Sequence, residues 1–105
     1  MNAIPRRLLT DTVSVLTYQG EGAYGPVFAA KSVSVSCRAE AERQLVRNAN
    51  GEEVVSELRL FVHPDDAAPL TVGSLVTFAG RGSTVLGVSP KTRPGEVHHV
   101  EVTCS

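Results

Sequence analysis

Residues 33–62 read VSVSCRAEAERQLVRNANGEEVVSELRLFV, and this stretch decides the fold class. Residues 33–42 and 54–62 alternate apolar and polar side chains, which is typical of half-buried β-strands. Asn50-Gly51 between them is the strongest short-range signal for a hairpin with a two-residue turn. The stretch therefore predicts one long antiparallel hairpin.

The register of this hairpin predicts an apolar face near its base. With a two-residue turn, Ala41 faces Leu60 and Ala39 faces Val62. Arms of about ten residues reach roughly 30 Å at ~3.3 Å per residue, so the far half is expected to project from a small domain. Polar and charged side chains dominate that half: Arg43, Gln44, Arg47, Asn48, Glu52, Glu53 and Glu57.

The charges of the hairpin form two interspersed sets of opposite sign, which favours a role in assembly. A solvated turn without a function is the alternative interpretation of such a tip. Interspersed opposite charges suit pairing between identical copies in a ring, where they fix the register more than they add affinity. The two sets are Glu40, Glu42, Glu53 and Glu57 against Arg38, Arg43, Arg47 and Arg59.

The rest of the chain also reads as short strands. Residues 12–18 alternate and are rich in β-branched residues, which predicts a strand. Residues 20–26 contain the spacing GxGxxG, but Pro26 and a β-rich stretch follow where a dinucleotide site needs a helix. We expect a loop there and no nucleotide site.

The second half predicts another hairpin and a closing strand. Residues 75–79 and 83–89 flank the turn Gly80-Arg81-Gly82, residues 90–96 read as an exposed loop, and residues 97–104 as a strand. One helical turn is expected at residues 5–9. Six or seven short strands in residues 1–105 predict a single all-β domain, a small antiparallel β-barrel with one long projecting hairpin; a sandwich is the alternative.

Composition argues against several function classes. The chain has 10 Lys and Arg against 11 Asp and Glu, a net charge of -1, so it offers no basic field for phosphate neutralisation. Five scattered aromatic residues and no Trp provide no stacking platform for single strands. The start has no apolar stretch of signal-peptide length, which predicts a soluble protein that is neither exported nor inserted in a membrane.

No residue pattern points to catalysis, a cofactor or a metal. Cys37 and Cys104 alternate in phase with apolar neighbours, which predicts two buried thiols. His63 stands before Pro-Asp-Asp, which is ordinary turn chemistry. His98 and His99 are neighbours in a strand, so their side chains are expected on opposite faces. We therefore expect a protein that is not an enzyme.

Four segments, taken in their order and spacing, resemble the head-closure proteins, or head-to-tail stoppers, of long-tailed bacteriophages. They are residues 4–9 (IPRRLL), 22–28 (GAYGPVF), 37–40 (CRAE) and 45–55 (LVRNANGEEVV). The similarity continues through residues 69–77, 80–89 and 99–102, so it covers nearly the whole chain.

The resemblance implies a β-barrel subunit of a six-fold ring in the virion neck, assembled in the cytoplasm of the bacterial host. The partners it implies are the portal and adaptor ring on the head side and the tail terminator on the other side, with double-stranded DNA passing transiently. It also implies a channel-facing element over residues 43–57, with these candidates: Arg43, Gln44, Arg47, Asn48, Asn50, Gly51, Glu52, Glu53 and Glu57.

Two other functions stay open from the sequence. A tail or tail-terminator subunit is a structural alternative, although such subunits usually carry helices against the sheet. An OB-like nucleic-acid-binding module is an alternative from another class, which the charge and the aromatic content disfavour.

Overall fold

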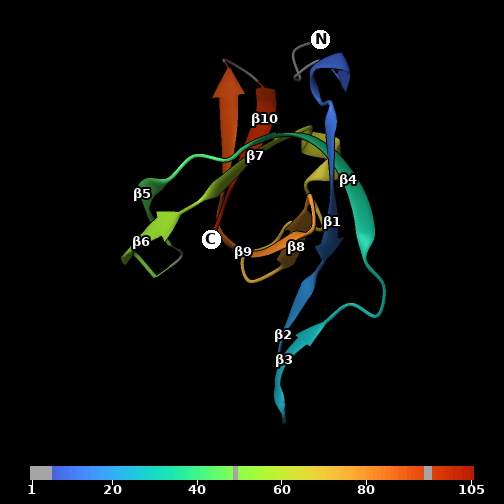
Figure 1. Cartoon of the computed structure of the whole chain (residues 1–105), viewed down its shortest axis with the longest axis vertical. Helices are drawn as coiled ribbons and strands as arrows, with labels where there is room; N and C mark the ends of the chain where they lie inside the picture. Colours follow the sequence, from blue (N-terminus) through green and yellow to red (C-terminus); the bar gives the residue numbers. More distant parts are fainter. Residues whose placement is uncertain (1–5, 49, 94–95) are drawn as a thin grey trace.

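The computed structural model describes residues 6–48, 50–93 and 96–105 (Figure 1). Nearly all of the regular structure in these residues is β-strand, and two short 3-10 turns are the remaining regular elements. The 3-10 turns are η1 (Arg6–Leu8) and η2 (Pro64–Asp66). The strands are β1 (Asp11–Leu16), β2 (Tyr18–Gly22), β3 (Gly25–Phe28), β4 (Val33–Glu40), β5 (Gln44–Arg47), β6 (Glu53–Ser56), β7 (Leu58–Val62), β8 (Leu75–Phe78), β9 (Arg81–Arg93) and β10 (Glu96–Cys104).

Six strands close into an antiparallel barrel in the order β1-β4-β7-β10-β9-β8, with β8 returning to β1. Figure 1 views this ring of strands nearly end on. Closure removes most of the free strand edges that an open sheet would expose. The predicted all-β class and small barrel are confirmed.

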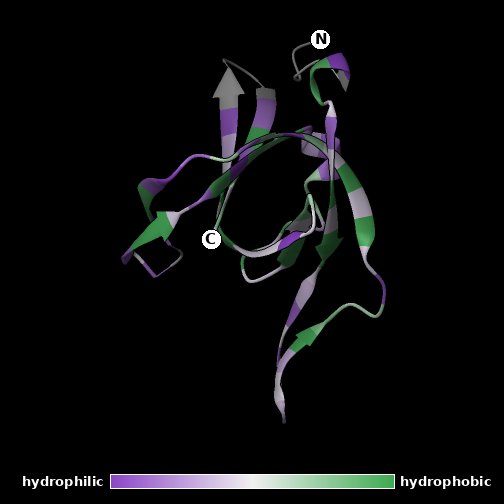
Figure 2. Ribbon diagram, in the orientation of Figure 1, coloured by the Kyte–Doolittle hydropathy of each residue, from purple (hydrophilic) through white to green (hydrophobic). Residues whose placement is uncertain are grey.

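The barrel interior is filled by side chains of alternate strand residues. In β7, Leu58, Leu60 and Val62 point inward and are buried, whereas Arg59 and Phe61 between them are half-buried. The neighbouring strands follow the same alternation, and the bands of apolar and polar colour along β4 in Figure 2 show it. The buried core consists of Val13, Val15, Val35, Cys37, Leu58, Leu60, Val62, Leu70, Val76, Val85, Val100, Val102 and Cys104.

The single long hairpin predicted for residues 33–62 is not confirmed. Its base is the barrel pair β4 and β7, in which Ala39 faces Leu60 and Cys37 faces Val62. The predicted partner of Ala39, Val62, is therefore wrong by two residues, and Leu60, which was predicted to face Ala41, pairs with Ala39 instead. β5 and β6 form a separate two-stranded sheet, in which Arg47 faces Glu53.

Residues 20–26 do not form the predicted loop. β2 and β3 pair as a hairpin in which Gly22 faces Gly25, and we call residues 18–28 the glycine arm. The arm extends away from the barrel in Figure 1. At its base the rings of Tyr18 and Phe28 meet edge to face, with centroids 5.9 Å apart.

Three further local predictions need correction. β9 and β10 continue through most of the segment expected to be the loop of residues 90–96, of which residues 94 and 95 lie outside the described part. The β8–β9 turn consists of Ala79 and Gly80, both with positive φ, instead of Gly80-Arg81-Gly82. The expected helical turn corresponds to η1, although Pro5 lies outside the described residues.

His98 and His99 do not lie on opposite faces. The ladder between β9 and β10 shifts register between Val97 and His99, and such an irregularity re-aims a side chain. The Nδ1 atoms of the two rings are 2.8 Å apart, and the rings stand edge to face. Strict alternation failed here because an irregular ladder breaks the period of two.

Candidate assembly surface at the distal hairpin

The candidate residues gather on the hairpin of β5 and β6, and we call residues 44–56 the distal hairpin. Its strands are four residues long, so each spans only about 13 Å at ~3.3 Å per residue. Figure 1 shows it beside the barrel, next to β9 and β10. The arm of roughly 30 Å that the sequence predicts is therefore absent from this part of the fold.

Asn48 organises the turn at the tip. The Gly51 N–H donates to the Asn48 carbonyl at 3.0 Å, and Gly51 adopts φ +81°, the left-handed conformation that glycine tolerates. The Asn48 side-chain oxygen accepts from the N–H groups of Asn50 and Glu52, both at 3.0 Å. This geometry is typical of a three-residue hairpin loop, which replaces the predicted two-residue turn.

The outward face of the distal hairpin carries an apolar pair between two ion pairs. Leu45 faces Val55 across the strands, and Leu45 is 68% exposed. Arg47 and Glu53 follow toward the tip, with nitrogen and oxygen 3.9 Å apart. Arg43 near the root lies 3.7 Å from Glu57. The face is therefore less polar than expected, because the alternation places Leu45 and Val55 together.

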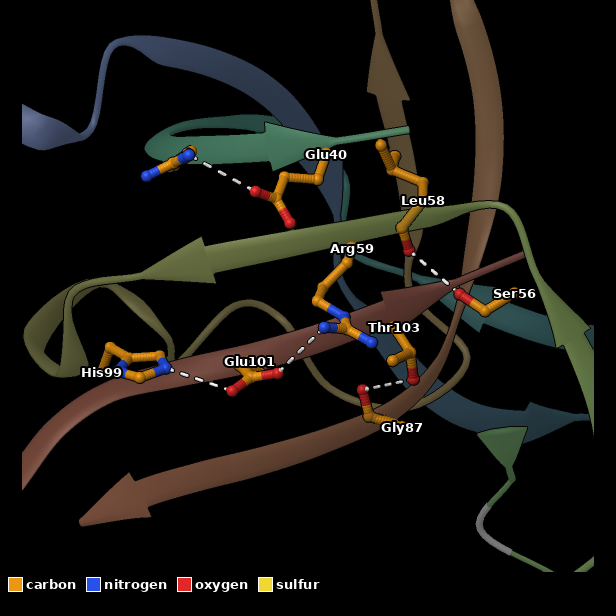
Figure 3. Close-up of polar contacts among 9 residues, drawn as sticks. Glu40, Ser56, Leu58, Arg59, Gly87, His99, Glu101 and Thr103 are labelled. Carbon is orange, nitrogen blue, oxygen red and sulfur yellow. Dashed lines mark hydrogen bonds and ion pairs between the residues drawn. The ribbon is translucent and has the colours of Figure 1, made fainter. Parts of the chain in front are cut away.

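Ser56 and Glu57 fix the root of the distal hairpin to the end of β10. Ser56 is fully buried, and its hydroxyl lies 2.9 Å from the Cys104 carbonyl. The same hydroxyl lies 3.2 Å from the Leu58 carbonyl (Figure 3). The Glu57 N–H donates to the same Cys104 carbonyl at 3.0 Å. The Glu57 carboxylate also lies 3.8 Å from the Arg81 guanidinium on β9. The root is therefore anchored to the barrel, whereas the tip is exposed.

The inward face of the distal hairpin borders a groove of about 300 Å³ against the barrel. The hairpin approaches the barrel at Gly87, where an added Cβ would lie 3.8 Å from the Arg47 carbonyl and 3.2 Å from the Thr103 hydroxyl. Most of the residues that line the groove are charged or polar: Gln44, Arg47, Arg59, Ser89, Lys91, Glu101 and Thr103.

A row of polar contacts on β7 and β10 supports the floor of this groove (Figure 3). The Arg59 guanidinium lies 3.8 Å from the Glu101 carboxylate, whose other oxygen lies 3.2 Å from His99 Nε2. The Thr103 hydroxyl donates to the Gly87 carbonyl at 3.4 Å. These contacts hold the outer face of the barrel in one arrangement beside the distal hairpin.

All nine candidate residues lie on the distal hairpin or immediately next to it. Their charges pair within one chain, as the Arg43, Arg47 and Glu57 contacts show. Asn48 also donates through its side-chain nitrogen to the Glu52 carboxylate at 3.2 Å. Because most of these side chains are exposed, each ion pair contributes little to the stability of one chain.

Sequence reasoning missed two exposed features. Leu45-Val46 and Val54-Val55 stand symmetrically about the turn, and that symmetry was the available signal for the apolar pair. Tyr24, fully exposed at the tip of the glycine arm, had no comparable signal, because its surroundings look like a loop.

The two thiols are buried and free, as predicted. Burial raises the pKa of Cys37 from 9.0 to about 11, with a smaller contribution from the Asp11 carboxylate. Burial likewise raises the pKa of Cys104 to about 12, with Cys37 as the second cause. Nucleophilic chemistry needs a thiolate, so neither cysteine is set up as a nucleophile near neutral pH.

Within the residues that the structure describes, no group of three or more His, Cys, Asp or Glu side chains is arranged to hold a metal ion. His63 instead caps η2, since its Nδ1 accepts from the Asp65 N–H at 3.1 Å. No helix in the described ranges is long and apolar enough to cross a membrane. No protein-family model matches the chain, and no curated protein matches its sequence.

Proposed function

We propose that this chain is the subunit of a ring that closes the DNA-filled head of a long-tailed bacteriophage and offers the attachment surface for the tail. The observation that carries the proposal is the distal hairpin, which leaves the barrel ladder at the segment that the resemblance to head-closure proteins assigns to the channel. The proposed ring has six copies in the virion neck, between the portal with its adaptor and the tail terminator.

The chemistry of the distal hairpin supports a contact between copies. Arg47 and Glu53 are 70% and 61% exposed, so their ion pair contributes little to one subunit and is easily exchanged with a neighbour. Leu45 and Val55 between the ion pairs offer apolar surface that a neighbouring hairpin buries. Opposite charges around an apolar centre give the register and the affinity of such a contact.

The near-neutral charge supports passage of DNA. With a net charge of -1, the chain does not hold phosphates as a basic protein does. A tail-terminator subunit would fit the same barrel, and it is separated from our proposal by its place in the particle. Electron cryo-microscopy of virions is expected to show this chain in the neck with six-fold symmetry, and density along the tail tube would contradict the proposal.

A loop deletion tests closure of the head. Replacing residues 48–52 with Asn-Gly joins Arg47 to Glu53 by a two-residue turn and shortens the distal hairpin without touching the Ser56 anchor. Phages with this change are expected to package DNA and then lose it, giving empty heads before tails attach. Glu21→Gln, an exposed substitution on the glycine arm outside the nine candidates, is the control and is expected to retain DNA. Full heads in the shortened variant would place closure elsewhere.

A further inference from the structure

A second surface lies on the opposite flank of the barrel, along the first half of β4. β1 pairs with β4 from Val33 to Cys37, but β7 pairs with β4 only from Cys37 to Glu40. After Val62 the chain turns into η2 and does not continue as a strand. In the described part of the chain, no strand pairs with the outer edge of β4 over residues 33–36.

The register shows which backbone groups this edge presents. The Ala39 N–H donates to the Asp11 side chain at 3.0 Å, on the β1 side. Because successive residues of a strand point their N–H and C=O groups to opposite sides, the odd residues of β4 face β1. Ser34 and Ser36 therefore direct their backbone N–H and C=O groups away from β1. The edge offers two donors and two acceptors at the spacing of a β-ladder.

A groove of about 740 Å³ runs along this edge. Residues of β4 form one wall, and η2 with the following segment forms the other. The lining residues are Val33, Ser34, Val35, Ser36, Asp65, Asp66, Ala68 and Pro69. The volume lies in the range of about 300–1,000 Å³ that is common for ligand clefts, although its shape follows a strand edge.

The charge of the groove is one-sided. Asp65 and Asp66 are the charged residues among those that line it, and the Asp65 side chain is 78% exposed, with its carboxylate 3.7 Å from His63 Nδ1. An acidic rim beside an unpaired strand edge favours a strand whose own flanking side chains are basic. Main-chain hydrogen bonds give such an added strand its affinity, and the side chains give it specificity.

We infer that the β4 edge, over residues 33–36, binds an extended basic segment of a partner protein by β-strand addition. The added strand pairs with the backbone of Ser34 and Ser36, and its Lys or Arg side chains approach Asp65 and Asp66. This inference goes beyond the proposed ring, because the groove involves none of the distal hairpin. Peptide binding by the purified chain tests it independently of the ring.

Peptides of alternating Lys and Val test the inference directly. A fluorescein-labelled six-residue peptide of this kind is expected to bind the purified chain in a fluorescence anisotropy titration, and the matched Glu-Val peptide is expected to bind at least ~5-fold more weakly. No binding by the Lys-Val peptide at about 1 mM, which corresponds to only ~4 kcal/mol of affinity, would overturn the inference.

Backbone methylation separates strand addition from simple charge attraction. Only alternate N–H groups of an added strand face β4, so methylating the Lys nitrogens and methylating the Val nitrogens must have unequal effects. One of the two peptides is expected to bind ~10-fold more weakly than the other, because it loses several hydrogen bonds. Equal binding by both would contradict a β-ladder at this edge.

Three variants of the chain localise the binding. Ser34→Pro removes an N–H that faces the groove and leaves the β1 ladder intact, so it is expected to weaken binding while circular dichroism stays unchanged. Asp65→Asn with Asp66→Asn is expected to lower the affinity for the Lys-Val peptide ~2- to 10-fold and to reduce its salt dependence. Glu52→Gln with Glu53→Gln on the distal hairpin is the matched control, and an equal loss there would overturn the location.

Native mass spectrometry tests a second copy as the occupant. We expect the Lys-Val peptide to leave the oligomeric state of the chain unchanged. Dissociation of an oligomer by excess peptide would show that another copy occupies the groove, and it would overturn the assignment to a partner protein.

Discussion

The barrel and the distal hairpin are built from the same kind of antiparallel strand pair, yet they differ in what stabilises them. In the barrel, both edges of β7 are paired, and Leu60 is completely buried. In the distal hairpin, β5 and β6 pair with each other only, and Leu45 is 68% exposed. The closed barrel thus carries a hairpin whose apolar side chains remain largely exposed.

The root shows how the two regions are joined without being merged. Ser56 is fully buried, and its hydroxyl together with the Glu57 N–H reaches the Cys104 carbonyl at the end of β10. Beyond this joint, the hairpin and barrel leave a groove between them. The contacts at the root fix the direction in which the distal hairpin leaves the barrel, and the outward face of the hairpin does not pack against the core.

The same Leu→Ala substitution in each region tests this difference most severely. Leu60→Ala leaves a cavity in a closed barrel and is expected to lower the free energy of unfolding by about 2–5 kcal/mol. Leu45→Ala removes an exposed side chain and is expected to change it by less than ~0.5 kcal/mol. Urea unfolding of both variants measures the difference. Comparable losses would show that the distal hairpin is part of the core.

The two buried thiols of the barrel are expected to make the free energy of unfolding fall at alkaline pH. The folded state raises both thiol pKa values, from 9.0 to about 11 for Cys37 and about 12 for Cys104, so the folded state binds the protons more tightly. The stabilisation is complete below pH 9.0 and is lost as the pH rises toward 11 and 12. We expect a loss of roughly 2 kcal/mol per thiol at about pH 10.5.

The double variant Cys37→Ala and Cys104→Ala is the control for this titration. Its stability at neutral pH will be lower because of lost packing, but the slope of stability against pH between 9.0 and 11 is expected to flatten. Urea unfolding at several pH values measures the slope. An unchanged slope in the variant would show that the thiols titrate equally in both states.

Strand alternation predicted the barrel because its strands obey the period of two. β1, β4, β7 and β10 were found close to their expected places, since each buries every second residue. The candidate residues were also found together, because they are near neighbours in one hairpin.

Local backbone chemistry explains what alternation missed. The glycine arm looked like a loop because its strands are rich in glycine. The partner of Ala39 was misplaced because the register shifts by one residue at the Asn48 turn and by one more between the distal hairpin and the barrel. The contact of His98 with His99 depends on a register shift that no pattern of apolar residues reveals. The groove beside β4 depends on where β7 stops pairing, which is a property of the closed barrel.

The smallest expected effect concerns the tip of the distal hairpin. Asn48→Ala removes an oxygen that accepts from the Asn50 and Glu52 N–H groups, and a side-chain donor to the Glu52 carboxylate. Because water replaces these exposed bonds, we expect a local loss of about 0.5–1 kcal/mol and no change in the barrel. Hydrogen exchange should quicken in β5 and β6 alone. Asn50→Ala is the control, because it keeps the backbone N–H that donates to the Asn48 side-chain oxygen. It should leave hydrogen exchange nearly unchanged. Faster exchange in β7 or β10 after Asn48→Ala would mean that the tip and the barrel unfold as one unit, and the two regions would then not be separable.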